Sequence, residues 1–584
     1  MLVVLQIPAC RVRPGLAPPP QERQQQRDVR RVALLRRSLQ PAKPRPLDVQ
    51  AQQRVHPVIR RQENRVTCAD PSCVLTRRKV FPARQNPPSD PCPHRVPRHP
   101  EHPPHRSKIL SQPPASTRVF NRELRNSGES WPNSKITVGL SPAALPKRGS
   151  GFDMAIAVAI LAAADAVPLA TPAGAMFLAE LGLDGRLRPV PGVLPAVAAA
   201  EGGVSTVVVA AQNVAEAALV PGVRVVGANT LTEVIVWLRG GPLPVLAPVP
   251  EPPNGPPSAD ALAKRLDLAD VLGQAEARLA AEICAAGGHN LSLLGPPGAG
   301  KTMLAERLPT ILPELERAAA IEVTSIHSIA GRLPAGAGLL SMPPFCAPHH
   351  TSSMAAIVGG GSGVVRPGAA SLAHNGILFL DEAPEFHRDV LDALRQPLES
   401  GEVVIARSGA QAVFPARFTL VMAANPCPCA NTAGPGKAGC SCSPAARRRY
   451  LARISGPLLD RVDVKVRLQP VSRRDMLYDR KFAETSATVA RRVIAARERC
   501  TARLAGTPWR LNAEVPGTVL RREFPPRPGA LASLDRAMEL GQVSARGADK
   551  IVRVAWSLAD LAGQDQPGAD QVNLAIGLWL GVAQ

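Results

Sequence analysis

Long apolar runs are scarce in this chain of 584 residues, and their scarcity excludes several classes of protein. The most apolar stretch, Met154 to Leu183, is interrupted by Asp165, Pro168 and Pro172. It therefore falls short of the roughly 18 uninterrupted apolar residues that a membrane-spanning helix needs. The opening MLVVLQIPAC has neither the basic segment nor the apolar length of a secretory signal peptide. We expect a cytoplasmic protein with no membrane partner.

Cysteine is also too thinly spread to form a disulfide framework. The chain has 11 cysteines, whereas small secreted scaffolds place theirs densely and at regular spacing. This usage favours a reducing compartment, in agreement with a cytoplasmic location.

Aromatic residues and hydrophobic periodicity are nearly absent from the first 120 residues, whose only aromatics are Phe81 and Phe120. This stretch holds 23 Lys and Arg against 7 Asp and Glu, so it carries +16 of the total net charge of +22. A chain rich in Arg, Pro and Gln cannot bury enough apolar surface to fold, and we expect residues 1–121 to be disordered. Two explanations stay open: a basic arm that binds nucleic acid through its phosphates, or a frame-shifted start.

A phosphate-binding loop stands near the middle of the chain. The stretch NLSLLGPPGAGKTM, Asn290 to Met303, combines an apolar strand with the pattern G-x-x-x-x-G-K-[ST] and a helix start. Glycines let the backbone curl so that its N–H groups converge on phosphate oxygens, Lys301 reaches the β and γ phosphates, and the Thr302 hydroxyl can bind Mg²⁺. The predicted ATP-binding residues here are Gly295, Pro296, Pro297, Gly298, Ala299, Gly300, Lys301 and Thr302.

A second motif completes a nucleotide site. GILFLDE, Gly376 to Glu382, is an apolar strand that ends in two carboxylates, about 80 residues after the loop. Such a strand can deliver Asp381 to the Mg²⁺ ion and Glu382 to the water that attacks the γ phosphate. The two motifs together predict hydrolysis of a nucleoside triphosphate, with ATP and Mg²⁺ as cofactors.

Residues 122–241 alternate short apolar strands with Ala-rich helices, which predicts an α/β or α+β domain. DMAIAVAILAAADA is typical of a buried helix, AMFLAELGLDGRLRPV of a hairpin that turns at Asp184 and Gly185, and STVVVAA and VRVVGA of strands.

Two segments of this domain, PKRGSGFDMAIAVAIL and DGRLRPVPGVLPAVAAA, resemble the parts of the Lon-protease-like domain that carry the catalytic serine and lysine. Read residue by residue, the serine position falls on Gly151 and the lysine position on Leu194, and Ser150 is one residue out of register. A serine nucleophile needs its base within hydrogen-bond reach. The resemblance therefore implies a Lon-like domain without peptidase activity, suited to docking, and partial because residues 1–121 replace its first strands.

The remaining boundaries follow from composition. Residues 242–257 are dense in proline and predict a semi-rigid linker. Residues 258–470 should form the ATPase domain, beginning with a helix that runs from an N-cap at Ser258 to Gly287 and Gly288. Residues 471–584 have helical periodicity and should form a helical lid.

Several further side chains are candidates for chemistry. FTLVMAANP ends in Asn425, whose amide can orient the attacking water, and SGPLLDRVDVKV presents Arg461 beside an acidic turn. His349, His350 and His374 lie in a glycine-rich segment without regular ligand spacing, which favours a pore or substrate loop over a metal site.

These motifs in this order resemble the AAA+ superfamily, in the clade shared by magnesium-chelatase motor subunits and minichromosome-maintenance helicases. APHHTSS, RPGAASLAHNGILFLDE, ANPCPC and SARGADKIVRVAWSLADLAG, together with a Lon-like domain, resemble the YifB/ComM magnesium-chelatase-like family. The resemblance covers the chain from about Arg122 onward. It implies a P-loop AAA+ core with a helical lid, and a DNA branch-migration role in natural transformation.

The resemblance also implies roles for single residues. Asn425 would be the sensor-1 residue, and Arg461 the arginine finger that reaches a neighbouring subunit's γ phosphate, which requires a homo-oligomeric ring and suggests a hexamer. Arg546 is the candidate sensor-2 residue, with Arg553 as the alternative. Trp556 departs from the family, which commonly carries arginine there.

Four cysteines follow Asn425 as two C-x-C pairs, at Cys427, Cys429, Cys440 and Cys442. They could hold a structural Zn²⁺, or they could be four reduced thiols. The spacing is tighter than in the usual zinc knuckle.

Taken together, these features predict an ATP-driven ring motor that acts on DNA. Two alternatives stay open: a magnesium-chelatase-type motor subunit for metal insertion, and a nucleotide-switched chaperone or scaffold. DNA-stimulated hydrolysis would separate the first from the other two.

Overall fold

The computed structural model describes residues 115–132, 136, 138, 149–168, 174–200, 203–244, 266–334, 336–361, 365–407, 410–430 and 440–581. Residues 1–114 of the stretch predicted to be disordered, and most of the predicted linker, lie outside these ranges. The prediction is wrong for residues 115–121, which belong to the helix α2(Ala115–Asn126). Leu124 of this helix is buried in the core of the domain that follows. The chain divides into two units, Met1–Ile7 with Gln112–Gln584, and Pro8–Ser111. Everything described below belongs to the first unit. None of the helices in the described ranges is long and apolar enough to cross a membrane.

The N-terminal described part is a small α/β domain, in agreement with the pattern of the sequence. Its parallel sheet has the order β1(Ala175–Leu178), β4(Thr206–Ala210), β5(Arg224–Ala228), and the inner strand β4 is buried over Val207–Ala210. The predicted hairpin forms as β2(Glu180–Leu181) and β3(Leu187–Arg188), with Gly185 in the left-handed conformation that its turn needs. The other elements are α2(Ala115–Asn126), η1(Ser150–Phe152), α3(Asp153–Ala163), α4(Val193–Ala199), η2(Ala211–Asn213), α5(Val214–Ala217) and α6(Leu231–Leu238).

Two hydrophobic clusters hold this domain together, one on each side of its sheet. Helix α3 is apolar on all sides and is buried in the first cluster with α6. Leu194 of α4 lies in the second cluster, with Val207 and Val209 of β4.

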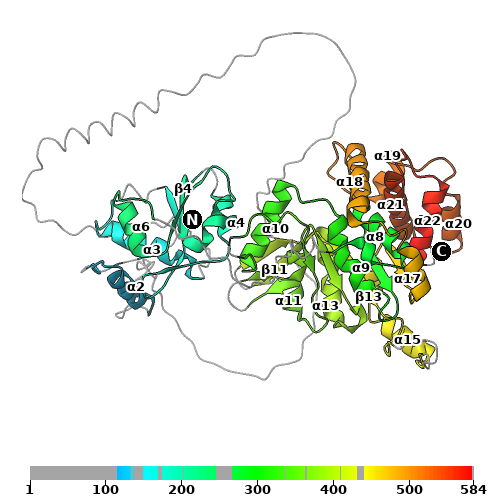
Figure 1. The fold of residues 1–584 in the computed structure, drawn as a ribbon, viewed down its shortest axis with the longest axis horizontal. Coiled ribbons are helices and arrows are strands. Elements are labelled where there is room, and N and C mark those ends of the chain that lie inside the picture. The colour runs from blue at the N-terminus through cyan, green and yellow to red at the C-terminus, as the bar shows by residue number, and fades with distance from the viewer. Residues whose placement is uncertain are drawn as a thin grey trace, which may run out of the picture. The chain divides into compact units, whose positions relative to one another are not determined.

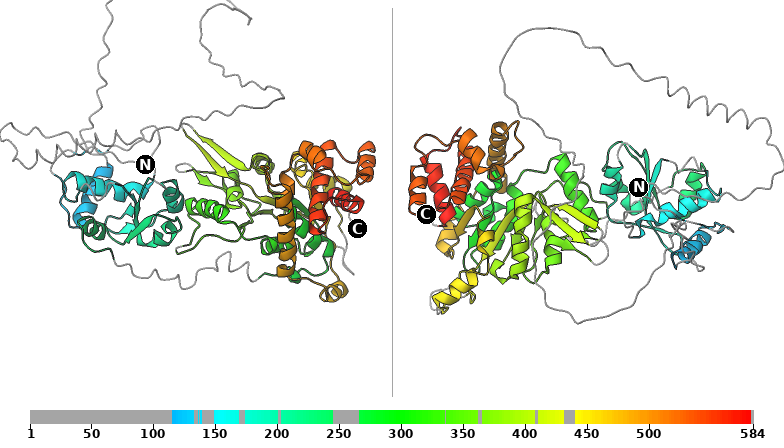
Figure 2. Two further views of the ribbon diagram at one scale, coloured as in Figure 1. Left: turned by 90° about the horizontal axis from the view of Figure 1, so that it is seen from above. Right: turned by 180° about the vertical axis from the view of Figure 1, so that it is seen from behind.

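The ATPase part is organised around five parallel strands, in the order β14(Val464–Arg467), β6(Leu291–Leu294), β13(Thr419–Ala424), β10(Ile377–Leu380), β7(Phe345–Cys346). Helices cover the sheet (Figures 1 and 2). Strands β10 and β13 read as continuous apolar runs because both of their faces are buried. Parallel strands end at one edge of the sheet, so β6, β10 and β13 bring the residues that follow them together.

Capping residues explain where helix α8, beside the sheet, begins and ends. Helix α8 runs from Ala275 to Gly287 and ends at Gly288 in the left-handed conformation, as expected. It begins later than predicted, because Asp267 caps the short η3(Leu268–Asp270) and a non-helical segment follows. The remaining elements are α9(Lys301–Arg307), η4(Leu308–Ile311), α10(Arg317–Ile329), α11(Met354–Val358), β8(Gly359–Gly360), β9(Arg366–Pro367), α12(Ala369–Leu372), η5(Ala383–Glu385), α13(Arg388–Ala393), α14(Arg395–Ser400), β11(Glu402–Arg407), β12(Ala410–Pro415), α15(Pro444–Leu451) and α16(Gly456–Leu459).

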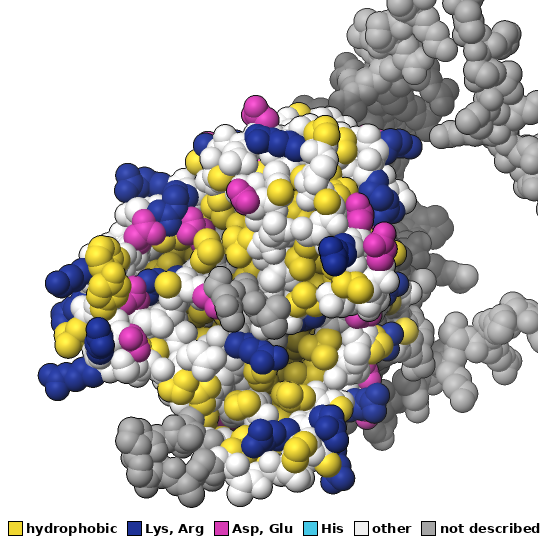
Figure 3. Space-filling model, turned by 90° about the vertical axis from the view of Figure 1, so that its right-hand side faces the viewer, with side chains coloured by type: hydrophobic (Ala, Val, Ile, Leu, Met, Phe, Trp, Pro, Cys, Tyr) yellow, Lys and Arg dark blue, Asp and Glu magenta, His cyan; other side chains and the backbone are white. Residues whose placement is uncertain are grey.

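The C-terminal third is helical, as its periodicity predicted. It consists of α17(Arg473–Asp479), α18(Ser486–Arg503), η6(Asn512–Glu514), α19(Gly517–Glu523), α20(Ala532–Glu539), α21(Ala545–Leu561) and α22(Ala569–Leu580). Its apolar side chains belong to the same core as β6 and α8, so these helices pack directly on the sheet domain. On the face of the molecule drawn in Figure 3, basic, acidic and hydrophobic side chains are intermixed.

Trp556 is a packing residue of this helical part. Its indole is buried and donates a hydrogen bond to the Phe524 carbonyl at 3.0 Å, and the Arg503 guanidinium lies 4.1 Å from the ring centre. Arg503 also forms an ion pair with the buried Asp560. At this position the chain uses tryptophan to fill the lid core and supplies a nearby positive charge from α18.

Candidate nucleotide-binding site

The phosphate-binding loop links the end of β6 to the start of α9. Gly298 and Gly300 have φ values of 78° and 89°, a region that residues with a side chain rarely adopt. Gly295 is needed for a different reason: a Cβ atom there would lie 2.8 Å from the Leu468 carbonyl oxygen. The three glycines of the motif thus serve two purposes, backbone curvature and close packing on the segment after β14.

Lys301 is buried at the first position of α9 and points back into the loop. Its ammonium donates to the carbonyls of Gly295 and Pro296, at 2.6 and 3.0 Å, and to the Asn425 side-chain oxygen at 3.0 Å. Burial lowers the pKa of Lys301, and the carboxylates of Asp381 and Glu382 act in the opposite direction. The loop lysine and the predicted sensor residue, 124 positions apart, are therefore in direct contact.

The two candidate Mg²⁺ ligands also meet. The Thr302 hydroxyl donates to the Asp381 carboxylate at 2.7 Å, and the other Asp381 oxygen accepts the Glu382 backbone N–H at 2.9 Å. A hydroxyl and a carboxylate are hard oxygen ligands of the kind that Mg²⁺ prefers, and both lie beside the phosphate loop. These two residues therefore fit a Mg²⁺ ion.

Glu382 stands at the strand end in an unusual backbone conformation. Its φ is 51°, which is uncommon for a residue with a side chain and occurs often at functional sites. Its side chain faces His350, whose Nδ1 lies 3.5 Å from a Glu382 carboxylate oxygen. His350 follows β7, the strand next to β10 in the sheet. The sequence placed His350 in a glycine-rich loop, and no local pattern predicted its contact with Glu382.

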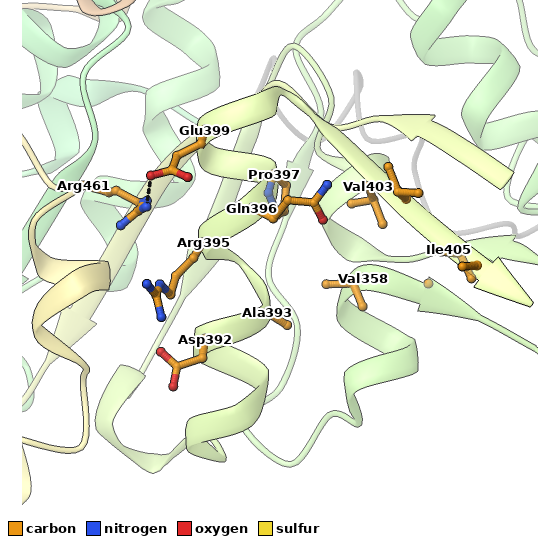
Figure 4. Close-up of a pocket in the computed structure, with 13 residues that line it drawn as sticks. Val358, Asp392, Ala393, Arg395, Gln396, Pro397, Glu399, Val403, Ile405 and Arg461 are labelled. Atoms are coloured by element: carbon orange, nitrogen blue, oxygen red, sulfur yellow. Dashed lines mark hydrogen bonds and ion pairs between the residues drawn. The ribbon is translucent and has the colours of Figure 1, made fainter. Parts of the chain in front are cut away.

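Arg461 lies away from the loop, directly after α16. Its guanidinium pairs with the Glu399 carboxylate and donates to the Pro457 carbonyl, and its own carbonyl accepts a hydrogen bond from the Asn290 side chain at 2.8 Å. The side chain borders an open hollow of about 590 Å³ that α13, α14 and β11 also line (Figure 4). Within this subunit Arg461 is therefore held by Glu399 rather than by the phosphate loop.

The two sensor-2 candidates occupy different environments on α21. Arg546 is three-quarters exposed, and its guanidinium lies 3.9 Å from the Asp460 carboxylate. Arg553 is half-buried and donates to the Val515 carbonyl at 2.7 Å, and desolvation lowers its pKa. The structure brings neither of these guanidinium groups into the hydrogen-bond set of Lys301, Thr302 and Asp381 described above.

A buried charge network joins the sheet to the C-terminal helices. Asp463 accepts from the Lys550 ammonium at 2.7 Å and from the Asn290 backbone N–H at 3.0 Å. His289 lies at 3.8 Å on the other side of the carboxylate and contacts the Ser557 hydroxyl of α21. Neither Asp463 nor Lys550 stood out in the sequence, because each lies among other charged residues and no local pattern reveals a partner 87 positions away.

The four cysteines predicted as a group do come together. The sulfur atoms of Cys427, Cys429, Cys440 and Cys442 all lie within 4.8 Å of one another. In the described ranges this is the one group of three or more Cys, His, Asp or Glu side chains so arranged. His374 is instead buried between the Glu322 carboxylate and the Arg417 backbone N–H.

In the N-terminal domain, Ser150 donates to the Glu180 carboxylate and Leu194 is fully buried. The positions that the predicted Lon-like resemblance assigns to the serine and the lysine are thus held by a glycine, Gly151, and a core leucine, Leu194.

A glycine-rich loop after an inner strand of an all-parallel sheet, facing a strand that ends in Asp-Glu, defines the P-loop class of nucleotide-binding proteins, and the strand order is consistent with an AAA+ core. Three family models match successive parts of the chain. "Subunit ChlI of Mg-chelatase" matches residues 114–213, "Magnesium chelatase, subunit ChlI" matches residues 267–476, and "Magnesium chelatase, subunit ChlI C-terminal" matches residues 483–578.

Individual relatives give a narrower placement. An uncharacterised protein of Mycobacterium tuberculosis is 50% identical over 78% of this chain and 88% of its own length. Competence protein ComM of Haemophilus influenzae is 41% identical, over 76% and 85% respectively. The uncharacterised protein YifB of Salmonella typhimurium is 39% identical, over 77% and 86%. The chain belongs to the YifB/ComM magnesium-chelatase-like family, which confirms the resemblance drawn from its motifs.

Proposed function

We propose that the chain is a Mg²⁺-dependent ATPase that works as a homo-oligomeric ring, a hexamer, and uses ATP hydrolysis to move DNA strands. The observation that carries the ATPase part is the meeting of four side chains from three strand ends: Lys301, Thr302, Asp381 and Asn425. Each of these contacts joins residues at least 79 positions apart and suits a bound nucleotide.

In this proposal each group has one task. The loop N–H groups and Lys301 bind and orient the phosphates, and Thr302 and Asp381 would hold Mg²⁺, which neutralises phosphate charge when bound. Glu382 takes a proton from the attacking water, and Asn425 orients that water. Arg461 supplies a positive charge to the γ phosphate of a neighbouring subunit, so a complete site needs two chains.

The DNA part of the proposal rests on the family. One relative is named a competence protein, and competence concerns the uptake and processing of DNA. Most of the net charge of +22 lies in residues 1–120, and the remaining residues carry only +6, so charge adds little to this part of the proposal. We propose branch migration or a similar recombination step as the reaction that the motor drives.

The family models support one other candidate, because all three carry the name of a magnesium-chelatase subunit. In that case ATP hydrolysis would drive insertion of Mg²⁺ into a porphyrin by a partner enzyme. A nucleotide-switched scaffold, which uses its N-terminal α/β domain for docking, is a third candidate with less support.

ATP turnover by the full chain, with and without branched DNA, tests the proposal. We expect branched DNA to raise turnover and Lys301→Ala to abolish it. Turnover that ignores DNA but rises with a porphyrin and its chelatase partner would replace the DNA motor with the chelatase candidate. Turnover that responds neither to branched DNA nor to a porphyrin with its partner would keep the ATPase assignment. It would exclude the DNA motor and the chelatase motor and favour the scaffold.

A further inference from the structure

The four-cysteine group described above forms a compact sulfur cage between the end of β13 and the start of α15. The Cys427 and Cys429 sulfurs lie 3.3 Å apart, and the Cys440 sulfur lies 3.4 Å from Cys429 and 3.2 Å from Cys427. All four thiols are free of disulfide bonds, and these separations are well beyond the roughly 2.05 Å of a disulfide.

The size of the cage suits one particular kind of ion. Zinc binds thiolate sulfur at about 2.3 Å in a tetrahedron, which sets sulfur atoms roughly 3.8 Å apart along each edge. The observed separations are a few tenths of an ångström shorter, so a small outward shift of the side chains accommodates the ion. Four soft sulfur ligands favour zinc over the hard cation Mg²⁺ of the nucleotide site.

The surroundings of the cage also suit a thiolate cluster. The Cys442 backbone N–H points to the Cys440 sulfur at 3.4 Å, which is the kind of outer contact that steadies a ligating thiolate. A zinc ion with four thiolates carries a net charge of about −2. The next helix, α15, presents Arg447, Arg448 and Arg449, and Arg447 donates to the Cys440 carbonyl at 3.5 Å. The positive charge of Arg447 therefore offsets part of the cluster charge.

We propose that Cys427, Cys429, Cys440 and Cys442 bind one structural Zn²⁺ ion, which fastens α15 to the end of β13. The cage begins two residues after Asn425, so the ion joins the strand end of the nucleotide site to the helix. The proposal does not depend on ATP hydrolysis or on DNA.

The other end of helix α15 contacts the segment that follows Glu382. Tyr450 of α15 is buried, and burial and the carboxylates of Glu385 and Glu382 raise its pKa to about 12. Arg453, just after the helix, donates to the Glu385 carboxylate at 2.8 Å and to the Pro384 carbonyl at 3.2 Å. The C-terminal end of α15, with Arg453, thus contacts η5, which begins immediately after Glu382. The proposed zinc ion would hold the N-terminal end of the same helix.

Metal analysis of the full chain, purified without a metal-affinity tag from zinc-supplemented cells, tests the site directly. We expect about one zinc ion per chain, and a loss of at least about tenfold in bound zinc in Cys427→Ser and in Cys440→Ser. Cys346→Ser is the matched control, because Cys346 is another free thiol of this domain and lies in β7, outside the cage. It should keep the full zinc content.

A second measurement covers the case in which Cys427→Ser, whose cysteine is buried, fails to fold. Cobalt substituted into the unaltered chain should show the intense visible bands of a tetrahedral four-sulfur site, and Cys442→Ser, at a half-exposed position, should weaken them. A chain that stays free of metal after exposure to zinc or cobalt, with all four thiols reacting at once with a thiol reagent, would overturn the proposal. So would a disulfide found within the cage.

Discussion

At the scale of single residues, the ammonium of Lys301 is the best-defined group of the nucleotide site. It is buried and held by three oxygen atoms, two from the loop and one from Asn425. Its place is therefore set before any phosphate arrives, and a preorganised positive charge is the kind of group that stabilises charge developing in a transition state.

Replacement of Lys301 by alanine should lower ATP turnover by about 10² or more, because loss of one such preorganised group typically costs that much. Steady-state phosphate release measures the effect. Lys481→Ala removes an exposed charge after α17 and serves as the control. Equal turnover in the two variants would contradict the assigned role of Lys301.

Glu382→Gln should separate nucleotide binding from hydrolysis. The amide keeps the shape of the side chain but cannot take a proton, so turnover should fall by about 10² to 10⁴ while ATP still binds. Fluorescent-nucleotide binding and phosphate release measure the two properties. Glu498→Gln, on the exposed side of α18, should change neither. A Glu382→Gln chain that hydrolyses ATP normally would exclude this residue as the base.

At the scale of elements, the lid helix α21 is joined to the sheet by the buried pair of Lys550 and Asp463. Burial by itself raises the pKa of Asp463, but hydrogen bonds and charges from His289 and Lys550 outweigh it and hold the pKa well below its ordinary value. Asp463 therefore stays ionised in the folded chain at pH values where the unfolded chain would bind a proton. Its stabilising effect is present above the unfolded pKa and is lost as pH falls through the folded pKa.

Lys550→Ala should destabilise the chain by about 3 to 5 kcal/mol near neutral pH, because it leaves a buried carboxylate without its main partner. It should also reduce the loss of stability in acid, since the Asp463 pKa would rise toward its ordinary value. Urea denaturation near neutral and at acid pH, followed by tryptophan fluorescence, measures both effects. Arg546→Ala alters an exposed residue of the same helix and should stay within about 0.5 kcal/mol of the unaltered chain. Similar midpoints for the two variants would refute a stabilising pair.

At the scale of the whole molecule, the proposed ring gives Arg461 its task. Its guanidinium pairs with Glu399 and borders the hollow between α13, α14 and β11, whereas the phosphate loop of the same chain follows β6. An arginine that acts on the next subunit needs a head-to-tail interface, and such an interface forms a ring where the rotation between subunits closes.

Mixing two inactive variants tests this arrangement. Arg461→Ala and Lys301→Ala should each hydrolyse ATP poorly, but a mixture that exchanges subunits should regain activity. A site is competent where the Arg461→Ala chain supplies the intact loop and the neighbouring Lys301→Ala chain supplies the intact arginine. Random mixing of equal amounts gives this arrangement at about a quarter of interfaces. Lys481→Ala mixed with Lys301→Ala supplies the control for dilution alone. A mixture as inactive as its parts would place Arg461 outside the neighbour's site.

The sequence predicted those parts of the site that are built from consecutive residues. The loop from Gly295 to Thr302 and the strand that ends in Asp381 and Glu382 appeared as short motifs, because their geometry depends on local backbone conformation and on apolar strands. The cysteine group was predicted from spacing alone, and its four sulfur atoms do gather. The start of α8 was placed too early, because helical periodicity continued through a segment that Asp267 and its contacts hold in another shape.

By itself, the sequence determined the nucleotide-binding class, the α/β pattern, the helical C-terminal part and the family, since each follows from local patterns of residues. Only the tertiary structure decided that His350 faces Glu382, that Glu399 holds Arg461, and that Lys550 meets Asp463. These pairs form between elements whose neighbours are chosen by the order of strands in the sheet and by the packing of the lid on a common core. Which elements become neighbours depends on how the chain buries its apolar surface as a whole. A short stretch of sequence therefore does not predict these contacts.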